Sequence, residues 1–323
     1  MADADVIKIA QSLGVSVKSL YMLSNNPMRL REKRRKPRYE NYRRVVIHRG
    51  RGRKNRVLSV PNEFLRRVQR GILKKYLYNL EPSEYATAYL PGFSVRANAL
   101  PHTGKEFIVK TDILHFFDSI DEELVWRTVR ELGFSIPATT LLTDLCVYRD
   151  RLPQGAPTSP HLANLVMRRF DEKIGAWCKE RGITYTRYCD DMSFSGQKDA
   201  VCGVGLIGEV RKELHRMGLQ LNDEKTAFIP ASQQQRVTGA VVNKKTRLSR
   251  DARRELRQAV YYCEKFGVKE HLAHRNDPSA PEEYLRSLLG KISFALQLDP
   301  TDGEMREMFR KVKNMTEPRT GRT

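Results

Sequence analysis

Two adjacent carboxylates stand in the stretch Arg187-Tyr188-Cys189-Asp190-Asp191-Met192-Ser193-Phe194, inside a run that otherwise alternates in polarity as a β-strand does. Adjacent acids at the tip of a β-hairpin repel each other, and burying them without a counter-charge is strongly unfavourable. A strand that carries them there needs a compensating cation, and carboxylate oxygens suit Mg²⁺. An isolated Asp-Asp pair is more often a solvated turn, so the surrounding chain decides between the two interpretations.

A third carboxylate lies upstream in the sequence. Asp112 follows the apolar run Phe107-Ile108-Val109, which predicts a buried strand with the acid near its end. Two Mg²⁺ ions held by three such carboxylates can activate a 3′-hydroxyl and stabilise the departing pyrophosphate in nucleotidyl transfer. The pattern therefore predicts a site for this chemistry.

The charge of the chain is far from ordinary. Its 323 residues carry a formal net charge of +20, whereas the hydrophobic content of 40% is typical of a globular protein. Such an excess attracts polyanions at long range and predicts salt-dependent binding to phosphate backbones. A basic, ribosome-associated protein is the alternative that charge alone leaves open.

The cysteines and the apolar segments indicate a reduced, aqueous compartment. The five cysteines lack CxxC or metal-ligand spacing, which favours free thiols over a disulfide framework; they are Cys146, Cys178, Cys189, Cys202 and Cys263. The first residues lack the pattern of a signal peptide, and no stretch reaches the roughly 20 apolar residues of a membrane span. We expect a soluble, cytoplasmic protein with no membrane partner.

The N-terminal quarter combines helical and basic segments. Residues 3–23 have the apolar spacing of one or two short helices, and residues 29–56 are dense in Lys and Arg. This basic arm is either a flexible solvated segment or a nucleic-acid contact. Within it, 43–48 and 56–60 predict a β-hairpin with a basic tip, followed by a helix that Pro61 begins.

The C-terminal part changes to helix alone. From Ser249 onward the apolar spacing predicts three helices, over 251–266, 282–298 and 304–315. Four arginines stand near the start of the first helix, and they suit either phosphate contacts or a solvated helix face; they are Arg250, Arg253, Arg254 and Arg257.

The order of these elements resembles the palm of a reverse transcriptase. The strand aspartate is followed by the loop Gln154-Gly155-Ala156-Pro157-Thr158-Ser159-Pro160, the Tyr188-x-Asp-Asp hairpin and the run Gly218-Leu219-Gln220-Leu221-Asn222-x-x-Lys225-Thr226. The matched motifs span residues 54–245. Each motif alone is weak, and their joint occurrence in this order carries the resemblance.

Two further stretches resemble elements of the bacterial retron reverse transcriptases. These are Asn98-Ala99-Leu100-Pro101-His102, before the palm motifs, and Val237-Thr238-Gly239, after them. Group II intron, diversity-generating and phage-defence reverse transcriptases share the central motifs and stay as alternatives. No maturase or endonuclease extension is evident, which counts against an intron enzyme.

The resemblance implies catalytic roles residue by residue. Asp112, Asp190 and Asp191 hold two Mg²⁺ ions, together with the main-chain carbonyl of Ile113. Phe117 is the bulky residue that excludes a ribose 2′-hydroxyl and so selects dNTPs, or else simply a core aromatic. By the same resemblance, Lys225 lies near the incoming phosphates and Arg56 grips the triphosphate. Gln154 and Gly155 line the nascent base pair, and Tyr188 packs against the primer end.

The retron-like stretches imply recognition of RNA. Val237-Thr238-Gly239, with the neighbouring Arg236, would contact a structured non-coding RNA; an ordinary β-turn is the alternative. Asn98 and His102 would have a retron-specific role that the sequence leaves undefined, and a lone His beside Pro is otherwise a turn residue. The four arginines of the first C-terminal helix would hold RNA or hybrid.

The sequence thus predicts an α+β, right-hand polymerase with fingers, a palm of antiparallel sheet plus helices, and a helical thumb. Fingers and palm would occupy residues 1–246, with the helical and basic arm within 1–56, and the thumb residues 247–323. As a retron enzyme it would bind its cognate non-coding RNA and copy part of it into single-stranded DNA (msDNA), starting from a 2′-hydroxyl of an internal guanosine.

The expected partners are dNTPs, the RNA–DNA product, a separate effector protein in an anti-phage system, and a host ribonuclease H, since no such domain is evident in the sequence. Two other hypotheses remain open. One is a nucleoprotein scaffold that controls the effector, and the other is an RNA-dependent RNA polymerase.

Overall fold

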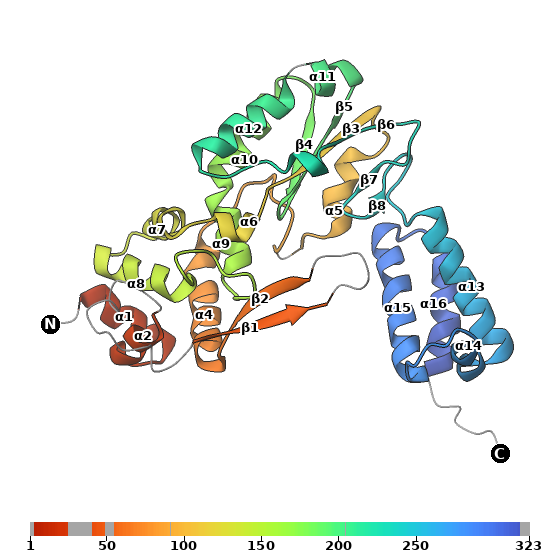
Figure 1. Ribbon diagram of the computed structural model, residues 1–323, viewed down its shortest axis with the longest axis horizontal. Coiled ribbons are helices and arrows are strands. Elements are labelled where there is room, and N and C mark those ends of the chain that lie inside the picture. The colour runs from red at the N-terminus through yellow and green to blue at the C-terminus, as the bar shows by residue number, and fades with distance from the viewer. Residues whose placement is uncertain (1–2, 25–40, 49–54, 91, 204, 317–323) are drawn as a thin grey trace. The chain divides into compact units, whose positions relative to one another are not determined.

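The computed structural model of the chain describes residues 3–24, 41–48, 55–90, 92–203 and 205–316. Helices and short strands alternate through most of this length, and the C-terminal part is helical (Figure 1). The chain divides into two compact units. The first unit comprises Met1–Gly92, Val109–Phe194 and Asp199–Ala227, and the second comprises Phe93–Ile108, Ser195–Lys198 and Phe228–Thr323.

The first unit contains most of the helices that precede the C-terminal part. Its longer helices are α1 (Ala4–Leu13), α2 (Val17–Leu23), α4 (Glu63–Lys75), α7 (Glu122–Arg130), α8 (Ile136–Cys146), α9 (Ser159–Val166), α10 (Arg168–Lys179) and α12 (Leu206–Arg216). Its short helices are η1 (Leu77–Asn79), α6 (Phe116–Ser119), α11 (Lys198–Gly203) and η3 (Asp223–Lys225). Asp3 begins α1 by accepting hydrogen bonds from the amides of Asp5 and Val6, and Gly14 ends it in the left-handed region.

The predicted hairpin is present. Strand β1 (Tyr42–Ile47) pairs antiparallel with β2 (Arg56–Pro61), with Tyr42 opposite Pro61 and Ile47 opposite Arg56. Its tip, residues 49–54, and residues 29–40 of the basic arm lie outside the described residues. Helix α4 begins one step later than predicted: Pro61 ends β2, and Asn62 caps the helix by accepting from the amide of Leu65 at 2.9 Å.

A four-stranded sheet carries the predicted acidic strands. Its order is β4-β5-β3-β6, with β3 (Phe107–Asp112), β4 (Thr184–Tyr188), β5 (Asp191–Gly196) and β6 (Ala227–Pro230). Only two residues connect β4 to β5, so these strands form a tight antiparallel hairpin. Helix α10 packs along β4 and against α12 (Figure 1). The sheet therefore presents the β4–β5 turn beside the end of β3.

The second unit contains the C-terminal helices and a small hairpin. Its elements are α5 (Val95–Ala99), η2 (Leu100–His102), β7 (Arg236–Val237), β8 (Ala240–Val241), α13 (Arg250–Phe266), α14 (Val268–His274), α15 (Pro281–Leu298) and α16 (Gly303–Thr316). Helix α14 was not predicted, because seven residues leave too short an apolar pattern to detect.

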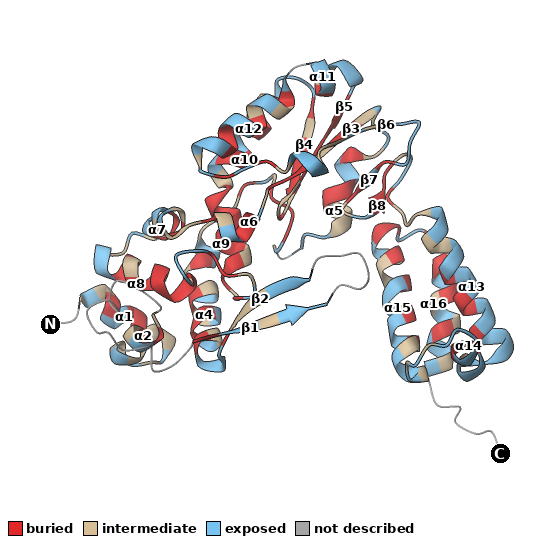
Figure 2. Cartoon of the chain, viewed as in Figure 1, coloured by how far each residue is buried: buried red, intermediate tan, exposed pale blue. Residues whose placement is uncertain are grey.

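Two apolar clusters hold this second unit together. One lies among α13, α15 and α16, where buried positions alternate with exposed ones at helical spacing (Figure 2). The other joins α5 to the β7–β8 hairpin and to the end of α15 through Ala99, Val237, Ala240 and Leu298. The α5 segment and the small hairpin are thus packed as one body.

These observations confirm the predicted fold class: mixed helices and antiparallel sheet, with a helical C-terminal region. The predicted boundary after residue 246 lies inside the second unit, so the limits of fingers, palm and thumb stay a prediction about function. No helix in the described parts of the chain is long and apolar enough to span a bilayer.

Candidate active site

Three carboxylates meet where β3 and β5 lie side by side in the sheet. Asp112 ends β3, Asp190 lies in the β4–β5 turn, and Asp191 begins β5. The amide of Ile113 donates to the carbonyl of Asp190 at 3.2 Å, which fastens the turn to the segment after β3. Asp112 is only 4% exposed, and the other two acids are half-buried. The structure therefore brings together the three acids that the sequence selected.

The electrostatics show an excess of negative charge at this point. Burial, then the charge of Asp112, raises the pKa of Asp190, and Asp191 adds to the effect. Burial also raises the pKa of Asp191, while Lys110 and Lys225 oppose the change. Ionised carboxylates held this close favour the binding of a cation.

Lys225 supplies one positive charge. Its Nζ lies 2.9 Å from both carboxylate oxygens of Asp112, and Nδ2 of Asn222 donates to Asp112 Oδ1 at 3.1 Å. Burial lowers the pKa of Lys225, but its bonds to Asp112 and the charges of the three acids outweigh this and raise it. The lysine side chain is 60% exposed, so it is free to move away from the carboxylate.

The donor set suits magnesium once Asp112 turns away from Lys225. Within the described ranges no group of three His, Cys, Asp or Glu side chains is arranged to hold a metal directly. Asp112 instead accepts from the ammonium of Lys225 and from the amide of Asn222. Oxygen donors with unbalanced negative charge are nevertheless the ligands that Mg²⁺ prefers.

Other predicted residues lie on elements around these acids. Phe117 is 8% exposed in α6, its ring 5.4 Å from that of Phe116, so it is packed on one side as the core interpretation requires. Tyr188 ends β4 and is half-buried. Arg56 begins β2 and is exposed.

The Gln154-Gly155 loop is bound to strand β2. The carbonyl of Gln154 accepts from the amide of Ser59 at 2.8 Å. Gly155 has a φ of +127°, and a Cβ there would lie 2.9 Å from the carbonyl oxygen of Ser59. Only glycine fits such a close approach of two main chains. The structure thus joins the loop to the hairpin that carries Arg56.

The two retron-like stretches touch each other in the second unit. Asn98, 1% exposed, donates from Nδ2 to Oγ1 of Thr238, a residue with a left-handed φ of 48°. Nδ1 of His102, which is fully buried, lies 2.6 Å from Oγ of Ser195. Burial, then the charge of Lys105, lowers the pKa of His102 to about 3, so the ring is neutral at pH 7. Arg236 and Gly239 are exposed beside this turn.

The four arginines of α13 differ in their surroundings. Arg253 pairs with Asp302 and Glu304, which raises its pKa, and Arg257 lies 2.9 Å from Glu304. Both therefore tie α13 to the start of α16. Arg250 is exposed, and Arg254 is 67% exposed although it lies 3.4 Å from Asp251 of the same helix, so these two are the better placed of the four to meet a ligand.

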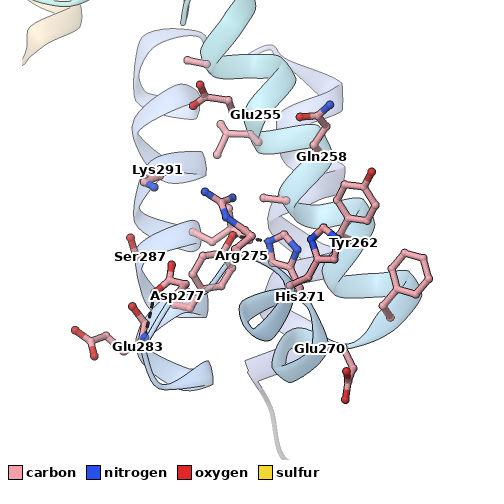
Figure 3. A pocket seen from close by; sticks show the side chains of 18 of the residues that line it. Glu255, Gln258, Tyr262, Glu270, His271, Arg275, Asp277, Glu283, Ser287 and Lys291 are labelled. Carbon is pink, nitrogen blue, oxygen red and sulfur yellow. Dashed lines mark hydrogen bonds between the residues drawn. The ribbon is translucent and has the colours of Figure 1, made fainter.

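A separate groove of about 1410 Å³ lies among α13, α14 and α15 (Figure 3). Aromatic rings line it, and Nε2 of His271 lies 3.0 Å from the hydroxyl of Tyr284. Its charged lining is mostly acidic, comprising Glu255, Glu270, Asp277 and Glu283 against Arg275 and Lys291. This balance is opposite to that of the whole chain and does not favour a phosphate backbone.

Three features of the site escaped the sequence analysis. Asn222 was quoted within a motif but given no role, although it contacts Asp112. The hydroxyl of Tyr89, a residue with a φ of 63°, donates to Sγ of Cys189 at 3.3 Å in the acidic turn. A buried pair, Arg187 and Asp171, lies behind the same turn. None has a local sequence signal, apart from the position of Asn222 in its motif.

Comparison with known proteins now identifies the family. Residues 48–242 match the family described as "Reverse transcriptase (RNA-dependent DNA polymerase)". The chain is 32% identical over 240 residues to the Retron Ec86 reverse transcriptase of Escherichia coli, covering 73% of each protein. It is also 32% identical to the Retron Mx65 reverse transcriptase of Myxococcus xanthus, covering 68% of this chain and 56% of that one. A third relative is the Retron Ec83 reverse transcriptase of Escherichia coli, at 29% identity and 79% coverage of that protein.

Among solved structures, apo telomerase from Candida tropicalis is similar at a TM-score of 0.47 and 13% identity, covering 94% of this chain and 66% of that one. A likeness this distant carries no weight for function. The family model matches more than half of the chain, and several retron enzymes are about 30% identical to it. On these grounds the chain belongs to the reverse transcriptase family, as a member of the retron type.

Proposed function

We propose that this protein is an RNA-directed DNA polymerase that binds a structured non-coding RNA and copies part of it into single-stranded DNA. The observation that carries the proposal is the cluster of Asp112, Asp190 and Asp191, in which burial and the neighbouring carboxylates raise the pKa values of Asp190 and Asp191. In a family of RNA-dependent DNA polymerases, such a cluster is suited to nucleotidyl transfer.

The three acids, with the carbonyl of Ile113, would hold two Mg²⁺ ions. When bound, the metal activates the attacking hydroxyl and stabilises the departing pyrophosphate. Lys225 neutralises Asp112 in their absence, and its exposed ammonium can turn to the phosphates of an incoming dNTP.

The neighbouring residues would hold and select the substrate. Arg56, exposed at the start of β2, would grip the triphosphate, and the loop of Gln154 and Gly155, fixed to β2, would line the nascent base pair. Tyr188 would contact the primer end. The packed ring of Phe117 would exclude a ribose 2′-hydroxyl, because its neighbour Phe116 leaves it little freedom to move aside.

RNA recognition would centre on the turn Val237-Thr238-Gly239 and the exposed Arg236. Asn98 and His102 are buried, so they would act indirectly, Asn98 through its bond to Thr238. Arg250 and Arg254 would contact phosphates from the thumb, residues 247–323, while residues 1–246 form fingers and palm. Such contacts position an RNA without reading its sequence.

The remaining retron properties belong to the same proposal. Synthesis would start from a 2′-hydroxyl of an internal guanosine and leave a branched RNA–DNA product (msDNA). A host ribonuclease H would remove template RNA, and a separate effector protein would act with the nucleoprotein in defence against phage. These rest on the relatives' being retron enzymes.

The test is to express the chain with its native flanking DNA and analyse the nucleic acid that co-purifies. DNase-sensitive material joined covalently to RNA is expected in the wild type and not in Asp190→Asn with Asp191→Asn. Asp199→Asn, an exposed acid in α11, is the matched control and should leave the product intact. Bound RNA without DNA would refute DNA synthesis.

A scaffold function is the second candidate, favoured by the groove of α13, α14 and α15, whose aromatic lining suits a protein partner and whose acidic side chains disfavour RNA. If Asp190→Asn with Asp191→Asn leaves phage protection intact, the scaffold is the operative function. The variant Phe117→Ala distinguishes a DNA polymerase from an RNA polymerase. If the ring of Phe117 selects the sugar, the variant should accept ribonucleotides; no change in sugar preference would remove this assignment.

A further inference from the structure

Arg187 and Asp171 form an ion pair that is completely buried in the first unit, with both side chains 0% exposed. Arg187 Nε and Nη2 lie 2.8 and 2.5 Å from the two oxygens of Asp171, and Tyr185 donates to the same carboxylate at 2.8 Å. The pair therefore joins β4 to α10 inside the protein. Burial disfavours the charged guanidinium, but Asp171 outweighs this and raises the pKa of Arg187, so it stays charged.

The remaining donor of the guanidinium points at the catalytic turn. Arg187 Nη1 donates to the carbonyl of Cys189 at 2.8 Å and to Oδ1 of Asn164 at 3.2 Å. Asn164 in turn donates to the carbonyl of Ala88 at 2.8 Å. The backbone of Arg187 is also fixed, because its amide donates to the carbonyl of Tyr85 at 2.8 Å. The guanidinium is thus a rigid support for the Cys189 carbonyl.

That carbonyl belongs to the peptide that carries Asp190. Cys189 has a φ of 61°, a conformation unfavourable for a residue with a side chain. An unsupported turn would relax, and its relaxation would rotate the Cys189–Asp190 peptide and move the acid. Stability alone is a weak reason for a buried ion pair, since apolar side chains of similar volume are often as stabilising. Holding one peptide in one orientation is a task that such side chains cannot perform.

We propose that Arg187 and Asp171 are positioning residues, whose buried ion pair fixes the Cys189 carbonyl and thereby the place of the Asp190 carboxylate beside Asp112. This inference rests on the proposed function, because it requires Asp190 to take part in catalysis. Supports behind metal-binding side chains commonly change metal affinity or activity by about tenfold to a hundredfold when removed.

The test replaces the pair by apolar residues in the full chain, as Arg187→Met with Asp171→Leu, and measures DNA synthesis on a poly(rA)–oligo(dT) template-primer. The melting temperature should fall, because the buried hydroxyl of Tyr185 and the carbonyl of Cys189 lose their partners. In the protein that remains folded, kcat should fall about tenfold to a hundredfold with little change in KM for dTTP. Calorimetric titration with Mg²⁺ alone should show weaker binding. Unchanged kcat and unchanged Mg²⁺ affinity in the folded variant would overturn the proposal.

Two further variants keep the outcomes separable. Arg187→Lys retains the charge, but one ammonium cannot support both Asp171 and the Cys189 carbonyl. Its kcat should therefore fall, and this result does not depend on whether the double variant folds. A folded Arg187→Lys with wild-type kcat would also overturn the proposal. Asp190→Asn reports on the proposed function. If it remains active, that function is wrong; if it is inactive while the apolar pair is fully active, only the positioning role is wrong.

Discussion

Lowering the pH from 7 to 5 is expected to destabilise the folded chain by about 2 kcal/mol through His102 alone. The ring is fully buried beside Ser195, and burial, with Lys105, lowers its pKa from 6.5 to about 3. Below pH 6.5, His102 therefore binds a proton in the unfolded chain and stays neutral in the folded chain. A depressed histidine pKa gives stability that is present above the unfolded pKa and is lost as the pH falls.

The magnitude follows from proton linkage. Between the two pKa values, stability falls by about 1.4 kcal/mol per pH unit, because one more proton is bound in the unfolded state. From pH 6.5 to pH 5 this amounts to about 2 kcal/mol, and the loss would continue towards pH 3. It exceeds what an exposed histidine would contribute, since exposure leaves the pKa the same in both states.

The assay is urea denaturation followed by circular dichroism at pH 7 and pH 5, on the wild type and on His102→Asn. Asparagine places an amide near the position of Nδ1 and does not titrate. All other titrating groups are shared, so the wild type should lose about 2 kcal/mol more than the variant over this range. Equal pH dependence in the two proteins would refute a buried, neutral His102.

Three other changes test separate parts of the site. Gly155→Ala should destabilise the chain by about 1–3 kcal/mol, from its φ of +127° and the contact with a β2 carbonyl, as measured by thermal denaturation; Gly208→Ala, with nothing within 4 Å of its Cβ, is the control that should not. Lys225→Met should tighten Mg²⁺ binding a few-fold in calorimetry, because the ammonium no longer competes for Asp112, and weaker binding would contradict that competition. Asn98→Ala should weaken binding of the cognate RNA by about 1–2 kcal/mol without changing the salt dependence of the affinity, since no phosphate contact is lost; a shallower salt slope would mean that Asn98 lies at the RNA.

Local patterns predicted many elements of the fold and the places of the three acids in it. An apolar run placed Asp112 at the end of a strand, and alternation placed Asp190 in a hairpin; both placements are confirmed. A strand or hairpin is specified by neighbouring residues, so its signal can be seen in a short window. Helix α14 and the exact start of α4 were missed because their signals are a helix of only seven residues and a single capping residue.

Contacts between distant parts of the chain were not predictable. Asn98 and Thr238 are 140 residues apart, and nothing in either stretch indicates the other. Arg253 was assigned to RNA by its position among basic residues, yet it pairs with Asp302 and Glu304. A charged side chain looks the same in sequence whether it faces solvent or a partner, and only tertiary packing decides.

The contact of Asn98 with Thr238 has a practical consequence for engineering. The turn 237–239 depends on a side chain of α5 for its shape, so it is not a portable module. A turn grafted alone from another retron enzyme would have to pack against the Asn98 side chain of this protein, which need not suit the new turn. A chimaera that exchanges residues 95–102 together with 236–242 would carry the turn and its support together, and this larger exchange is the one that should transfer RNA preference between enzymes.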